Sequence, residues 1–269
     1  MYPAFDKIRE MAAAGDYKRI PICKELYADS YTPVEMMRIL QKASHHCYLL
    51  ESASQNEVWG RYSFLGYDPS MEITCTDGTL RIRRTDELFE KKTDALETGK
   101  AETNKADALH IGKKQSEAVM QVTHPGDAIR KIIQQYKSPV MDNMPTFTSG
   151  LVGYFSYDYL GYSEPSVRAE LEDTEAFRDL DLMLFDKVIA FDNFRQKIIL
   201  IANMRLDEAE AGYNRAVMEL KQMASLLRDG EKKQEPGGHL AGEVTPLFDR
   251  DAYCGMVEKA KQYIREGDI

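Results

Sequence analysis

Two short segments of the chain, 48–53 and 60–69, contain side chains that could bind a charged small molecule. A free amino acid needs a carboxylate for its ammonium group, hydrogen-bond donors for its carboxylate, and an apolar or aromatic wall for its side chain. Glu51, Arg61 and the rings of Tyr62 and Phe64 supply these three functions. The two segments are therefore a candidate site for a free amino acid.

The same residues have a simpler interpretation that needs no ligand. Opposite charges often face each other across paired strands, so Glu51 and Arg61 could form an internal ion pair. The pattern alone favours this ion pair. Nowhere does the sequence combine a nucleophile with a general base in a recognisable arrangement, so no catalytic residue is predicted.

A glycine-containing segment at 150–159, GLVGYFSYDY, could also bring backbone close to a ligand. Its spacing fits neither of the common phosphate-binding patterns, GxGxxG and GxxxxGK[ST]. Gly150 and Gly153 are therefore interpreted as bends in strands. The predicted core around these strands contains the rings of Tyr154, Phe155 and Tyr157.

The two candidate segments require a β-hairpin to hold them together. A helix is predicted just before it, because Thr32, Pro33 and Glu35 form a capping box with proline at the first helical position. Its predicted buried stripe consists of Val34, Met37, Leu40 and Ala43.

Alternating apolar residues predict further antiparallel strands, which include a second hairpin over 71–82 that turns at Asp77-Gly78. The segments 150–162 and 180–204 alternate in the same way, with a turn near Asn193. Amphipathic helices are predicted at 4–14, 124–137, 207–229 and 248–266. The expected fold is α+β, a largely antiparallel β-sheet with flanking helices.

Composition divides the chain into two expected parts. Residues 1–229 form the first, and they include an exposed connection at 86–121 that has few apolar residues. The glycine-rich and charged stretch 230–246 is typical of a linker, and 247–269 contains the last helix.

The overall composition disfavours some classes of binding partner. The 269 residues are 43% hydrophobic, which is enough for a globular core, and carry a net charge of -9 that disfavours nucleic acid and anionic membranes. Four widely separated cysteines lack metal-ligand spacing and are expected to be reduced. With no membrane span or signal peptide predicted, the expected location is the cytoplasm.

Four segments taken in order resemble anthranilate synthase component I, a member of the chorismate-utilising enzyme family. They are YLLESA with GRYSFLGYDP, GLVGYFSYDYLGYSE, DLMLFDKVIAFDNFRQKIILIAN and YCGMVEKAKQYIREGDI. The resemblance covers nearly the whole chain. It implies that the first segment pair builds the pocket for the feedback inhibitor L-tryptophan, at positions matching Glu51, Ser52, Arg61, Tyr62 and Ser63.

The resemblance also implies the reaction of the parent subunit. Enzymes of this kind convert chorismate and ammonia to anthranilate and pyruvate, with Mg²⁺ and with ammonia from a glutamine amidotransferase subunit, component II. Their catalytic and metal-binding residues lie in a C-terminal half that starts at the segment matching 253–269. The chain is therefore expected to be an N-terminal portion that has no catalytic residue, metal site or cofactor of its own and is inactive alone.

Two alternatives remain open at this point. The large subunit of aminodeoxychorismate synthase, a folate-pathway enzyme, shares the architecture that the resemblance implies. The chain could also be a free-standing module that binds an amino acid.

Overall fold

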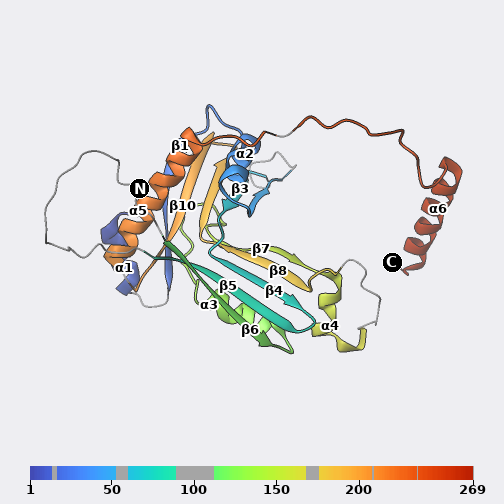
Figure 1. Cartoon of the computed structure of the whole chain (residues 1–269), viewed down its shortest axis with the longest axis horizontal. Coiled ribbons are helices and arrows are strands. Elements are labelled where there is room, and N and C mark those ends of the chain that lie inside the picture. The colour runs from blue at the N-terminus through green and yellow to red at the C-terminus, as the bar shows by residue number, and fades with distance from the viewer. Residues whose placement is uncertain are drawn as a thin grey trace, which may run out of the picture. The chain divides into compact units, whose positions relative to one another are not determined.

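The computed structural model describes residues 1–13, 17–52, 60–88, 112–167, 176–207, 209–234 and 236–268. The chain divides into two compact units, Met1–Lys233 and Gln234–Ile269. The first unit contains two five-stranded antiparallel sheets with helices packed on them (Figure 1). This mixture of helices and antiparallel sheets confirms the predicted α+β fold class.

The first sheet has the strand order β1-β10-β9-β3-β2. Its two hairpins, β2–β3 and β9–β10, are those that the sequence predicted around 47–69 and Asn193. The strands are β1 (Arg19–Tyr27), β2 (Cys47–Leu50), β3 (Tyr62–Tyr67), β9 (Lys187–Asp192) and β10 (Lys197–Arg205).

Both faces of the first sheet are buried. Helices cover one face: α1 (Phe5–Ala13), α2 (Pro33–Ala43) and α5 (Ala209–Asp229). The opposite face packs against the segment that contains Met141, Met144 and Phe147. Adjacent residues of β10 therefore enter different cores, as Leu200 faces the helices and Ile201 faces the other side.

Helix α2 begins as the sequence predicted. The Thr32 hydroxyl accepts a hydrogen bond from the Glu35 N–H, and the Glu35 side chain accepts one from the Thr32 N–H. The predicted buried stripe is confirmed at Leu40 but wrong at Val34 and Ala43, which are exposed, and Met37 is only partly buried. The buried residues are Met36, Ile39 and Leu40.

The second sheet has the strand order β6-β5-β4-β8-β7. Its strands are β4 (Met71–Thr76), β5 (Thr79–Leu88), β6 (Gly112–Gln121), β7 (Gly150–Phe155) and β8 (Leu180–Phe185). Helix α3 (Pro125–Gln134) covers one face through Ile129 and Ile132. The hairpin β4–β5 is the predicted one, and Asp186 alone connects β8 in this sheet to β9 in the first.

The predicted exposed connection at 86–121 is wrong at both of its described ends. Strand β5 continues to Leu88, and Gly112–Gln121 forms β6, which pairs with β5 along ten residues. An edge strand gains its order from main-chain hydrogen bonds, which the apolar pattern of its side chains does not reveal. The middle of the predicted connection, 89–111, lies outside the described residues.

The strand containing Gly150 and Gly153 is β7, which confirms that these glycines belong to a strand. A Cβ on Gly153 would lie 1.9 Å from the carbonyl oxygen of Asp181, so glycine is required for the close approach of β8. The predicted aromatic core is wrong, because Tyr154, Phe155 and Tyr157 are all exposed. Three short helices follow: η1 (Tyr157–Tyr159), α4 (Leu160–Ser163) and η2 (Pro165–Val167).

The second unit contains one helix, α6 (Arg250–Glu266), among its described residues. The Asp249 side chain caps its start and Gly267, with φ of 81°, ends it where the sequence predicted. Its apolar residues, which include Tyr253 and Ile264, are exposed. Within the described ranges, no helix combines the length and apolar character needed to cross a membrane.

Candidate functional site

Glu51 and Ser63 lie next to each other at one end of the first sheet. Leu50 pairs with Phe64 in the β2–β3 ladder, so the following residue, Glu51, reaches Ser63 on the neighbouring strand. The Ser63 hydroxyl donates to Glu51 Oε1 at 3.1 Å and accepts from Asn193 Nδ2 at 3.1 Å. Ser63 is buried while Glu51 is exposed, so a fixed hydroxyl orients a carboxylate that faces solvent.

Arg61 forms its ion pair with Asp192, at the end of β9, and not with Glu51 as the simpler interpretation proposed. The pair is bidentate, with Nε to Oδ1 at 3.1 Å and Nη2 to Oδ2 at 2.6 Å. Asp192 is only 2% exposed and also accepts from the Arg195 N–H. Burial alone would raise the pKa of Asp192, but the Arg61 guanidinium and the Arg195 N–H outweigh it and hold the pKa below its ordinary value.

Tyr62 lies on the other side of the sheet from Ser63, because successive strand residues point to opposite faces. Its ring lies 5.8 Å from that of Phe64, which contacts Phe147 edge-on at 5.6 Å. The Arg61 guanidinium stacks over the Tyr62 ring at 4.8 Å. Tyr62 therefore supports Arg61 and does not form a wall beside Glu51.

The structure thus divides the predicted residues into two neighbouring groups. Glu51 and Ser63 form one group and Arg61 and Tyr62 form the other, while Ser52 is exposed directly after Glu51. The rest of the β2–β3 connection, 53–59, lies outside the described residues. Sequence reasoning missed Asp192 and Asn193, because each is about 130 residues from its partner and only the sheet order brings them together.

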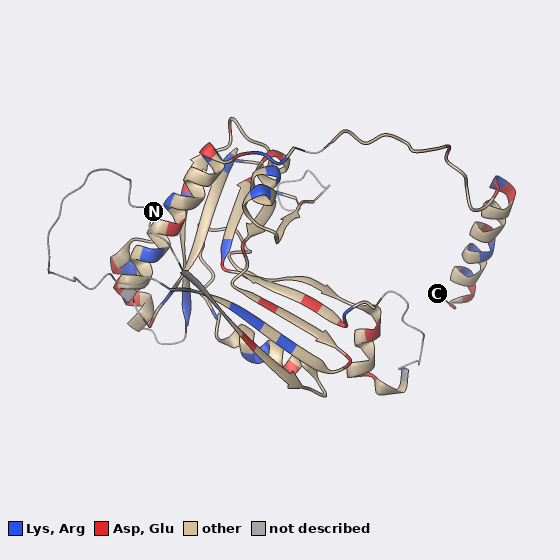
Figure 2. Ribbon diagram, viewed as in Figure 1, with Lys and Arg blue, Asp and Glu red and all other residues tan. Residues whose placement is uncertain are grey.

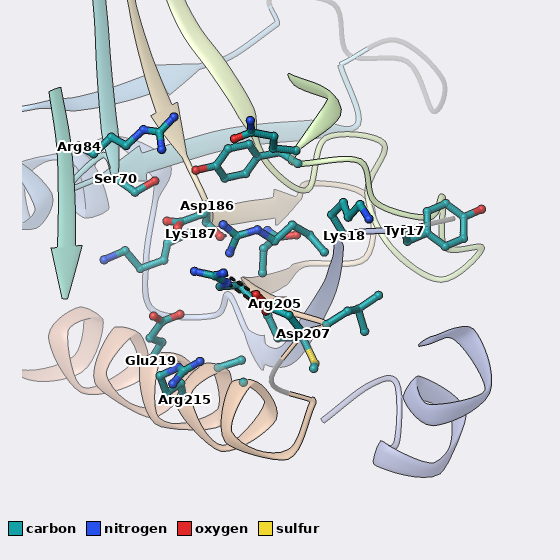
Figure 3. A pocket seen from close by; sticks show the side chains of 18 of the residues that line it. Tyr17, Lys18, Ser70, Arg84, Asp186, Lys187, Arg205, Asp207, Arg215 and Glu219 are labelled. Carbon is teal, nitrogen blue, oxygen red and sulfur yellow. Dashed lines mark hydrogen bonds and ion pairs between the residues drawn. The ribbon is translucent and has the colours of Figure 1, made fainter. Parts of the chain in front are cut away.

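A second polar site, not predicted from the sequence, lies at the opposite end of the first sheet. A cleft of about 1280 Å³ opens among β1, β10, α5, α3 and β5 (Figure 3). At its inner wall, Lys187 forms an ion pair with Asp68 at 3.1 Å. Burial of Lys187 opposes its charge, but Asp186 and Asp68 outweigh that effect and raise its pKa.

Neither site presents the ligands of a metal ion. Across the described ranges, His, Cys, Asp and Glu side chains do not gather in groups of three or more that could hold one. The Mg²⁺ that the family resemblance implies therefore has no ligand set among these residues. What the first site offers is an oriented carboxylate and a fixed guanidinium, which are groups for binding an ion of opposite charge.

Comparison with known proteins decides the family. A sequence model described as chorismate binding enzyme matches residues 84–269, which is more than half of the chain. The chain belongs to this family. The resemblance stated from the four sequence segments is thereby confirmed.

Several relatives within the chorismate binding enzymes carry specific names. Anthranilate synthase component 1 of Acetivibrio thermocellus is 30% identical over all of this chain and 49% of its own length, and that of Acinetobacter calcoaceticus is 30% identical over 98% and 47%. Aminodeoxychorismate synthase component 1 of Bacillus subtilis is 28% identical over 94% of this chain and 45% of its own length. The chain spans about half the length of these relatives.

A solved structure is also similar. Anthranilate synthase component I from Streptococcus pneumoniae aligns with 90% of this chain and 46% of its own, at 22% identity and a TM-score of 0.48.

Proposed function

We propose that this chain is the tryptophan-sensing portion of an anthranilate synthase component I subunit. The parent subunit would convert chorismate to anthranilate in the cytoplasm, with Mg²⁺ and with ammonia from a glutamine amidotransferase partner. Two relatives named anthranilate synthase component 1 support the parent reaction, and each is about twice as long as this chain. The metal and the chemistry are assigned to the remainder of that parent.

The observation that carries the sensing role is the hydrogen bond from Ser63 to the exposed carboxylate of Glu51. A carboxylate that is already oriented loses little conformational freedom when it pairs with an ammonium group. The second oxygen of Glu51 stays available to the ligand, because Ser63 contacts Oε1. Glu51 would therefore bind the ammonium group of tryptophan, with Ser52 beside it.

Arg61 would supply donors to the ligand carboxylate. A guanidinium carries five N–H donors, and the bidentate pair with Asp192 uses only the edge formed by Nε and Nη2. The opposite edge, at Nη1, keeps its two donors for a ligand. Asp192 and the Tyr62 ring then act as supports that hold the guanidinium in place.

Calorimetric titration of the 269-residue chain with L-tryptophan tests this assignment. The variant Glu51→Gln keeps an oxygen that can accept from Ser63 but removes the charge, so we expect tryptophan to bind about tenfold more weakly or worse. Indole-3-propionate, which lacks the ammonium group, should bind the variant and the unmodified chain equally.

The matched control is Glu25→Gln, which changes a carboxylate at the opposite edge strand, β1, of the same sheet. Its tryptophan affinity should equal that of the unmodified chain. If the unmodified chain does not bind tryptophan, or if Glu51→Gln binds it with unchanged affinity, the proposed site is wrong.

A parent of the aminodeoxychorismate synthase type is the second candidate, because a relative with that name is nearly as similar. Disrupting the parent gene distinguishes the two candidates. We expect the resulting cells to require tryptophan for growth, whereas a requirement for 4-aminobenzoate would favour the second candidate.

A further inference from the structure

The cleft at the far end of the first sheet concentrates positive charge on an acidic chain. Seven basic side chains line it against four acidic ones, although the whole chain has a net charge of -9 (Figure 3). Clefts lined by one sign of charge focus the electrostatic field and attract ions of the opposite sign. An excess of three positive charges therefore makes the cleft a site for an anion.

The cationic side chains Lys187 and Arg205 already have acidic partners. Lys187 pairs with Asp68, and Arg205 forms a bidentate pair with Asp207. Arg19 lies directly opposite Arg205 in the β1–β10 ladder, an arrangement of like charges that destabilises a sheet unless a counter-charge lies nearby. Asp207 supplies part of that counter-charge, since the charges of both Arg205 and Arg19 lower its pKa, and a bound anion would supply more.

The other five basic side chains of the cleft include three from three different elements. Arg19 comes from β1, Arg84 from β5 and Lys131 from α3. Within the described ranges, no carboxylate lies within 4.0 Å of the charged groups of Arg84 or Lys131. The ion pairs of the cleft instead involve Lys187 and Arg205.

The ring of Tyr136 lies beside one of these cations. The Arg19 guanidinium lies 4.6 Å from the centre of its ring. Burial raises the pKa of Tyr136, as does the charge of Asp186, while the charges of Arg19 and Arg84 lower it. The part of the cleft wall that contains Tyr136 therefore also contains cations from β1 and β5.

We propose that this cleft binds a small molecule through a phosphate group. Cations that approach from three separate elements suit the tetrahedral oxygens of phosphate better than the planar fork of a single carboxylate. The site is independent of the tryptophan proposal, because Glu51 and Arg61 lie at the other end of the strands that carry Lys187 and Asp68. A phosphate-bearing ligand in the cleft would therefore not block an amino acid from the first site.

Inorganic phosphate is the probe for this proposal, added to the 269-residue chain at constant ionic strength. The test variant Arg84→Gln/Lys131→Gln removes two cations of the cleft. The control variant Arg83→Gln/Arg130→Gln removes two charges from the adjacent positions of β5 and α3, where the side chains instead pair with Glu117 and Asp127 outside the cleft. All four side chains are exposed, so both variants should fold.

We expect phosphate to raise the melting temperature of the unmodified chain and of the control variant. Phosphate should bind the test variant about tenfold more weakly or worse, since each lost charge-assisted hydrogen bond lowers the affinity. Equal binding by both variants would overturn the site. An equal shift with succinate would overturn the assignment to phosphate, and no shift in the unmodified chain would overturn both.

Discussion

The two sheets differ in how many of their faces are buried. Helices and the segment around Met141 and Phe147 cover the first sheet on both sides, whereas, among the residues that the structure describes, α3 covers the second on one side. In Figure 2 the central strands of the first sheet carry few charges, while basic and acidic residues cross the second. The open face of the second sheet includes Glu72, Arg81, Arg83 and Glu117, which form exposed ion pairs.

This difference determines where each sheet can place polar groups. In the first sheet, a buried middle leaves only the strand ends for charge, and both proposed binding sites lie there. In the second sheet, charged residues are spread along a face where they pair with one another in water. Burial on both faces thus concentrates the functional groups at the ends of the strands.

The largest expected effect tests whether the first sheet is buried on both faces and the second sheet on one. Leu200→Ala and Ile201→Ala, on opposite faces of β10, should each lower the free energy of unfolding by about 2–5 kcal/mol. On β4, Ile73→Ala should cost as much, but Thr74→Ala on the open face should stay within about 0.5 kcal/mol. Urea unfolding measures all four, and a large loss for Thr74→Ala would show that the open face is covered.

A smaller effect tests the contact between β7 and β8. Gly153→Ala places a methyl group against the backbone of Asp181, which cannot rotate away, and should cost about 1–3 kcal/mol. Gly237→Ala, with no atom within 4 Å of the added Cβ, is the control and should be neutral. Thermal unfolding of both variants measures this difference; equal melting temperatures would contradict the packing described.

The buried ion pair at the end of the first sheet should matter more than an exposed pair on the second. Asp192→Asn should cost about 1–2 kcal/mol, less than for a fully buried pair because Arg61 is 27% exposed and can be hydrated. Glu117→Gln, which breaks pairs with exposed arginines, should cost less than about 0.5 kcal/mol. Denaturant titration compares them, and the reverse order would contradict the comparison of the two sheets.

The same pair predicts a pH dependence. The folded pKa of Asp192 lies below its ordinary value of 3.8, so its contribution to stability is present above pH 3.8 and is lost as the pH falls through the folded pKa. Asp192→Asn should remove that part of the acid dependence. An unchanged acid limb of the stability profile in this variant would mean that the pair does not stabilise the fold.

Local signals in the sequence predicted most of the elements. The capping box at Thr32, the Asp77-Gly78 turn and the glycine that ends α6 all act through neighbouring residues, so sequence alone locates them. Strand β6 was missed because its order comes from pairing with β5. In α2 the sequence identified Leu40 as buried but missed Met36 and Ile39, because the apolar pattern alone does not show which helix face the sheet covers.

The candidate site could be predicted only in part. The sequence identified Glu51 and Arg61 as charged groups near one hairpin. It did not show that Asp192 would form an ion pair with Arg61. Nor could it show which of Tyr62 and Ser63 would lie beside Glu51, because that depends on the pairing of β2 with β3. The basic cleft gave no sequence signal at all, as its residues come from separate elements without a shared motif.

Amide hydrogen exchange with and without L-tryptophan tests the sensing proposal most directly, because it locates the ligand on the chain. We predict slower exchange at 48–52, 61–66 and 190–195, the segments that surround Glu51 and Arg61. The segments that line the basic cleft, including 82–85 and 129–136, should exchange at the same rate in both conditions. Protection confined to the cleft, or absent from both ends of the first sheet, would contradict the assignment of tryptophan to this site.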